Sequence, residues 1–137
     1  MKIIALRGEG RKGKTSTLII VYEVLKKRGL TVVEYEALPN NDFRTVLKDS
    51  LGNLIGIVSQ GDYAIGSCSV KNHLKWAETK GCTKTICACT LGPHKEKIEG
   101  YIASFPDHCF IDKTIEMDSS KQVCANNKDA VIIETYI

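Results

Sequence analysis

The stretch Leu6 to Thr17, LRGEGRKGKTST, decides how this chain is organised. It follows the apolar run of residues 2–6 and combines three glycines with several cationic side chains. From Lys14 onward the period changes, and apolar residues recur at helical spacing until Gly29 provides a stop; these residues are Leu18, Val21, Tyr22 and Leu25. The sequence therefore predicts a strand, a glycine-rich loop and a helix in direct succession.

Within this stretch, residues 8–15 (GEGRKGKT) satisfy the pattern G-x-x-x-x-G-K-[ST] in the strand-to-helix context that a phosphate-binding loop requires. Glycines let the backbone pass close to an anion, so that successive N–H groups and the helix N-terminus point at phosphate oxygens. We expect Lys14 to neutralise the β- and γ-phosphates and the Thr15 hydroxyl to ligate Mg²⁺. The residues predicted to hold phosphate are Gly8, Glu9, Gly10, Arg11, Lys12, Gly13, Lys14, Thr15 and Ser16.

The rest of the chain alternates between strand-like and helix-like segments. Runs of apolar and β-branched residues predict strands at 31–38, 54–59, 83–90, 109–112 and 130–137. Helical spacing and capping residues predict helices at 42–48, 69–80, 95–104 and 119–128, the first of them a short helix capped by Asp42. Such alternation is typical of βαβ units. The expected fold class is α/β, a three-layer sandwich with a mostly parallel sheet of five or six strands, in which residues 1–137 form a single nucleotide-binding domain.

On the strength of residues 8–15, the Walker A motif, the chain resembles the P-loop NTPase superfamily over roughly its first thirty residues. Partition-type ATPases carry a lysine at the position that Glu9 holds here, and small GTPases carry Asn-Lys-x-Asp after the fourth strand, where residues 90–95 read TLGPHK. Elimination leaves the nucleoside and nucleotide kinases as the branch most similar in size. The chain departs from that branch as well, because it has no arginines between its last core strands, where nucleotide kinases place them.

The resemblance implies ATP or GTP as the bound nucleotide, Mg²⁺ as the metal, and three catalytic residues: Lys14, Asp62 and Glu36. Asp62 resembles a Walker B carboxylate, although it follows the apolar run at a slightly greater distance than the pattern usually has. With Thr15, it is expected to hold the metal. Glu36, preferred to Glu34, ends the second predicted strand, where kinases place the carboxylate that receives the acceptor's proton. The alternatives are an ordinary Gly-Asp turn for Asp62 and a solvated strand face for Glu36.

Three functions remain open. The first is a small kinase that transfers the γ-phosphoryl group to a nucleoside, a nucleotide or another small hydroxyl acceptor. The second is an NTP-binding switch or ATPase with water as acceptor, and the third is a catalytically inactive nucleotide-binding regulatory subunit. Adenine or guanine preference is undecided, and a homo-oligomer is compatible with each.

Composition narrows the classes of partner and compartment. A net charge of +3 over 137 residues, with basic residues concentrated at 7–14, favours a local anion site over a nucleic-acid surface. The longest apolar run, residues 18–21, is too short to span a membrane and no signal peptide is recognisable, so we expect a cytoplasmic protein. Cys82, Cys87 and Cys89 leave a metal site as an alternative, but zinc sites usually add a second cysteine pair or spaced histidines, and Cys87 and Cys89 read as residues of a buried strand.

Overall fold

The structure is a computed structural model that describes residues 1–10 and 13–137. Its centre is a six-stranded sheet of order β2-β3-β4-β5-β1-β6. The strands are β1 (Lys2–Glu9), β2 (Thr31–Ala37), β3 (Phe43–Lys48), β4 (Leu54–Val58), β5 (Lys84–Leu91) and β6 (His108–Asp112). The helices are α1 (Lys14–Lys27), α2 (Val70–Thr79), α3 (Glu96–Ala103) and α4 (Ser119–Glu134), with a short 3₁₀ turn at Pro39–Asn41.

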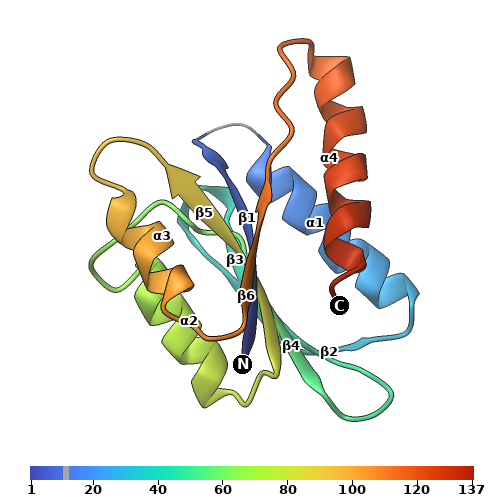
Figure 1. The fold of residues 1–137 in the computed structure, drawn as a ribbon. Helices are drawn as coiled ribbons and strands as arrows, with labels where there is room; N and C mark the ends of the chain where they lie inside the picture. Colours follow the sequence, from blue (N-terminus) through green and yellow to red (C-terminus); the bar gives the residue numbers. More distant parts are fainter. Residues whose placement is uncertain (11–12) are drawn as a thin grey trace.

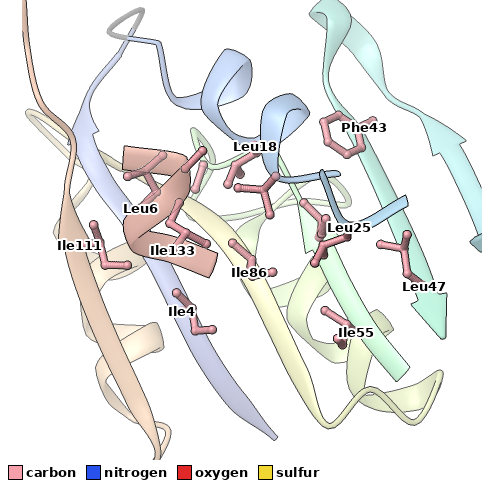
Figure 2. Packing of buried hydrophobic residues seen from close by; sticks show 14 residues of the cluster. Ile4, Leu6, Leu18, Leu25, Phe43, Leu47, Ile55, Ile86, Ile111 and Ile133 are labelled. Atoms are coloured by element: carbon pink, nitrogen blue, oxygen red, sulfur yellow. The ribbon is translucent and has the colours of Figure 1, made fainter. Parts of the chain in front are cut away.

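Helices cover both faces of the sheet, with α1 and α4 on one side and α2 and α3 on the other (Figure 1). The alternation of side chains along β1 explains this arrangement, because Ile4 and Leu6 enter one core while Ile3 and Ala5 enter the other. The first core joins the sheet to Leu18 and Leu25 of α1 and to Ile133 of α4, as Figure 2 shows. The second core receives the buried side chains of Val70, Leu74, Ile98 and Ile102.

The expected fold class, a P-loop NTPase-like sandwich with a mostly parallel sheet, is wrong. Strands β4, β5, β1 and β6 pair in parallel, but β2 pairs antiparallel with β3 and β3 pairs antiparallel with β4. The fold is α/β with a mixed sheet. The reason is that two consecutive hairpins, rather than a βαβ crossover, connect β2 to β4.

The short helix predicted at residues 42–48 is strand β3. Phe43, Thr45, Val46 and Leu47 are all buried, and aromatic and β-branched side chains of this kind suit a strand flanked on both edges. The preceding turn uses Asn40 and Asn41, both with positive φ, to reverse the chain from β2. The side chain of Asp42 consequently caps no helix and is directed elsewhere.

The strand predicted at residues 130–137 is also wrong, because α4 continues to Glu134. The segment AVIIETYI is rich in β-branched residues, yet the buried residues of α4 as a whole fall at helical spacing: Ala125, Asn126, Asp129, Ala130 and Ile133. Packing of this face against α1 and the sheet outweighs the weak intrinsic preference of valine and isoleucine for strands.

The remaining elements lie close to their predicted positions, including the strand and helix on either side of the glycine-rich stretch. Cys87 and Cys89 are buried in β5, which confirms that part of the interpretation, and burial raises the pKa of Cys89 to about 11. Among the residues that the structure describes, none of the helices has the length and apolar composition that crossing a bilayer requires.

Candidate functional site

A pocket of about 570 Å³ opens where the chain leaves β1, β4 and β5 at their carboxyl ends. In α/β sheets this edge is where ligands bind, because the loops that follow the strands converge there. The pocket also reaches the turn between β2 and β3 and the start of α1. Its described lining residues are Gly13, Lys14, Thr15, Ser16, Asn40, Asp42, Ser59, Asp62 and Thr90.

Lys14 is the first residue of α1, and its side chain folds back over the end of β1. The ammonium Nζ donates to the carbonyl oxygens of Gly8 at 3.0 Å and Glu9 at 2.5 Å, and the residue is only 6% exposed. Burial lowers the pKa of Lys14, while the charge of Asp62 acts in the opposite direction. A buried ammonium that has no carboxylate within ion-pair distance among the described residues favours an anion in the adjoining pocket.

Thr15 contacts the carboxylate of Asp42, the residue that the sequence predicts as a helix cap. Its Oγ1 donates to Asp42 Oδ1 at 3.0 Å, and the Ser59 hydroxyl donates to the same oxygen at 2.8 Å. Burial raises the pKa of Asp42, and the hydrogen bonds from Ser59 and Thr15 oppose that rise. Three segments distant in sequence therefore place three oxygen-bearing side chains together at one wall of the pocket.

Asp62 lies on the same pocket, as the sequence predicted, and its surroundings explain its offset from β4. The backbone amide of Thr90 donates to the Gly61 carbonyl at 3.0 Å, so the chain continues to pair beside β5 past the last residue of β4. A Cβ at Gly61 would lie 2.3 Å from the Ala88 carbonyl oxygen, so only glycine allows this approach. The Thr90 hydroxyl then donates to Asp62 Oδ1 at 2.6 Å and holds the carboxylate at the pocket.

Glu36 lies away from these residues. It is not among the described residues that line the pocket, and its carboxylate forms an ion pair with Arg44 across the β2–β3 hairpin. The Arg44 guanidinium also lies 4.3 Å from the centre of the Trp76 ring. The structure therefore brings together Lys14, Thr15 and Asp62 but does not bring Glu36 to them.

The other residues predicted to hold phosphate are distributed along the start of the site. Gly8 and Glu9 are the last residues of β1, and Gly10 follows them. Gly13 adopts a left-handed conformation with φ of 88° at the start of α1, and both Gly13 and Ser16 line the pocket. Arg11 and Lys12 lie outside the described residues.

The donor atoms at this pocket suit Mg²⁺. Magnesium prefers hard oxygen ligands and uses one or two carboxylates together with phosphate oxygens. The Thr15 hydroxyl and the Asp42 carboxylate are already within hydrogen-bond distance of each other, and Asp62 lies on the same cavity. Within the described residues no group of three or more histidine, cysteine, aspartate or glutamate side chains is placed to hold a metal ion. A magnesium ion at this pocket would therefore also need oxygen ligands from a bound phosphate.

Comparisons of this chain with protein-family models, curated proteins and solved structures give no match. Function is therefore inferred from the chemistry of the site.

Proposed function

We propose that this protein binds a magnesium-bound nucleoside triphosphate, ATP or GTP, in the 570 Å³ pocket and transfers its γ-phosphoryl group to an acceptor. The observation that carries the proposal is the pairing of a buried lysine with a phosphate-loop motif: Lys14 Nζ is held by the Gly8 and Glu9 carbonyls beside an open cavity. The similarity to P-loop NTPases in residues 8–15 supports this reading, while the mixed sheet makes no contribution to it.

The balance of charge at the pocket favours a metal-bound triphosphate over a free anion. Lys14 attracts phosphate, but Asp42 and Asp62 would repel it. Thr15, Asp42 and Asp62 would hold Mg²⁺, which when bound offsets the negative charge of the phosphate groups. The Lys14 ammonium would then face the phosphate groups, and the carboxylates of Asp42 and Asp62 would face the metal ion.

In this proposal the residues of the chain act by positioning and by electrostatics. Lys14 stabilises negative charge on the transferring group, and its burial excludes the water that would weaken the interaction. Ser59 and Thr90 fix the carboxylates of Asp42 and Asp62 through their hydroxyls. Phosphoryl transfer depends chiefly on these two effects, because its transition state is loose and needs little covalent help.

An NTP-binding switch or ATPase is the second candidate, and one observation favours it. The carboxylate expected to receive an acceptor's proton, Glu36, is engaged by Arg44 away from the pocket. Water would then be the acceptor, and slow hydrolysis would be coupled to a partner or to self-association. Production of the diphosphate that is stimulated by an added acceptor would identify a transferase, whereas basal hydrolysis that no acceptor stimulates would identify the switch.

The decisive test of nucleotide binding is Lys14→Ala. We expect isothermal titration calorimetry to show that this change weakens Mg-ATP and Mg-GTP binding by about a hundredfold or more, because a buried charge-assisted contact to phosphate is lost. Lys27→Ala, at an exposed lysine of the same helix, is the matched control and should bind like wild type. Equal affinity of wild type and Lys14→Ala would remove the basis of the proposal.

A further inference from the structure

A second cavity of about 510 Å³ lies between α2, α3 and the segment that connects β4 to α2. Its residues include Tyr63 and Ile65 of that segment, Val70 of α2, and Ile98 and Tyr101 of α3. Val70 and Ile98 are buried and form an apolar floor. The volume is in the range of pockets that accept small organic ligands.

The charged residues that line the cavity are all lysines. Lys71 and Lys75 stand one turn apart on α2, and Lys97 contributes from α3. None of these lysines forms an ion pair within residues 1–10 and 13–137, and no acidic side chain in that part of the chain lines the cavity. Three unpaired cations around one concavity favour an anionic ligand.

Two tyrosine rings, those of Tyr63 and Tyr101, add aromatic surface to the cavity. Tyr101 packs edge-on against Phe105, with ring centres 5.6 Å apart, and the Lys71 ammonium lies 5.9 Å from the centre of the Tyr101 ring. Tyr63 is 44% exposed, so part of its ring is accessible to a ligand in the cavity. Aromatic faces beside lysines suit a ligand that carries both a flat ring and a phosphate.

The two cavities are lined by consecutive residues where the chain passes from one to the other. Asp62 lines the first pocket, and the next residue, Tyr63, lines the second. Lys95 spans the boundary, because its ammonium donates to the Asp62 carbonyl and lies 5.8 Å from the centre of the Tyr63 ring. A ligand in the second cavity would therefore contact the residue that directly follows the carboxylate we assign to the metal of the first.

We propose that the second cavity binds the phosphoryl acceptor, and that the acceptor is a small phosphorylated molecule with an aromatic ring, of the class of nucleoside monophosphates. The role of this ligand as phosphoryl acceptor rests on the proposed function, whereas the presence of an anion-binding site in the second cavity does not. An oxygen of the acceptor phosphate forms a bond to the γ-phosphorus, the bond from that phosphorus to the β–γ bridging oxygen breaks, and the nucleoside diphosphate leaves with the electron pair.

This acceptor also accounts for the position of Glu36. A phosphate monoester has a second pKa of about 6, so its oxygen is already deprotonated near neutral pH and needs no carboxylate to receive a proton. A neutral hydroxyl acceptor would need one. The three lysines and the distance of Glu36 from the pocket therefore favour the same class of ligand.

Calorimetry with nucleoside monophosphates and no triphosphate tests the site directly. We expect wild type to bind at least one of AMP, GMP, CMP and UMP, and the triple variant K71Q/K75Q/K97Q to bind it at least about tenfold more weakly. The triple variant should retain Mg-ATP binding, because its changes lie outside the first pocket. The control K121Q/K128Q alters exposed lysines of α4 and should leave both affinities unchanged.

A further variant, tested with two ligands, separates the contribution of the aromatic base to binding from that of the phosphate. Tyr63→Ala should weaken binding of the monophosphate but not of ribose 5-phosphate, which lacks the aromatic base. Failure of all four monophosphates to bind wild type while Mg-ATP binds would overturn the second site and leave the first intact. Monophosphate binding that Lys14→Ala abolishes and the triple variant does not would also overturn it, because the ligand would then occupy the first pocket. Monophosphate binding without Mg-ATP binding would support the second site and reject the proposed function.

Discussion

Individual polar side chains in this protein are buried where a ligand or another polar group can satisfy them. Lys14, Asp42 and His73 are 6%, 8% and 1% exposed. His73 lies beneath the segment that carries Asp62, and its Nε2 contacts Gln60 Oε1 at 2.8 Å. Each such burial costs free energy unless the group is paired or remains neutral, so the ionisation of these residues affects stability.

His73 should make stability depend on pH between about 6.5 and 4. Burial lowers its pKa to about 4 from 6.5, and the charge of Arg44 acts in the same direction. In this interval the unfolded chain binds a proton that the folded chain does not, so the free energy of unfolding falls as the pH falls. The total loss attributable to His73 is about 3 kcal/mol, reached below pH 4.

Urea unfolding of wild type and His73→Gln at several pH values measures this contribution. Burial raises the pKa of Asp42, which changes the stability in the opposite direction, but this effect is present in both proteins and cancels in the comparison. The variant should lose most of the slope, whatever its stability at neutral pH. His94→Asn, at an exposed histidine with positive φ, should retain it. Identical slopes in wild type and His73→Gln would show that His73 ionises equally in both states.

The sequence predicted Lys14, Thr15 and Asp62 because a motif or the end of an apolar run marks each of them. Asp42 could not be identified in this way. Its contact with Thr15 exists only because the β2–β3 hairpin turns back over the start of α1, and a lone aspartate after Pro-Asn-Asn looks like a cap or a turn residue. Glu36 was placed correctly on a strand, but cross-strand pairing with Arg44 decided its direction.

Among the elements, those with an unbroken local signal were predicted and those chosen by their neighbours were not. Strands β1, β4 and β5 are apolar runs ended by breakers, and α1 has both its spacing and its terminal glycine in the sequence. Strand β3 and the last turns of α4 carry ambiguous sequences, and tertiary packing selects their conformation. The mixed sheet follows directly from the unexpected strand β3.

Helix α4 is held to the sheet by a buried ion pair, and breaking that pair should be costly. Lys113 Nζ lies 2.6 Å from Asp129 Oδ2, with side chains 0% and 1% exposed, and Asp129 also accepts from the Thr114 amide and hydroxyl. Asp129→Asn leaves the lysine charge buried without a carboxylate to neutralise it, although Lys113 Nζ still donates to the Thr114 carbonyl. We expect it to lower the free energy of unfolding by about 3–5 kcal/mol, measured by urea denaturation.

Two comparisons test this explanation. Glu23→Gln removes the partner of the exposed pair with Lys26 and should cost less than about 1 kcal/mol. The double variant K113M/D129N removes both charges and should recover part of the loss, because the asparagine can still accept from Thr114. An Asp129→Asn variant as stable as Glu23→Gln would mean that α4 is held by its apolar face alone.

Considered as a whole, the molecule assembles its candidate site from parts that are distant along the chain. The pocket combines the start of α1, the turn before β3, and the residues that follow β4 and β5. None of these segments can hold a metal-bound nucleotide unless the sheet is formed. A ligand that contacts all of them should therefore bind the folded state only and stabilise the whole fold by linkage.

We expect saturating Mg-ATP or Mg-GTP to raise the thermal midpoint, since a ligand at about 100 times its Kd adds about 2.7 kcal/mol to the free energy of unfolding. Chelation of Mg²⁺ should remove most of the shift, because Asp42 and Asp62 then repel the phosphates. The double variant D42N/D62N should reverse this dependence, with weaker stabilisation by the magnesium complex and stronger stabilisation by the free nucleotide. Asp107→Asn, at an exposed loop position, is the control. A midpoint shift that chelation leaves unchanged in wild type would show that these carboxylates hold no metal, and the negative charge at the pocket would then need another explanation.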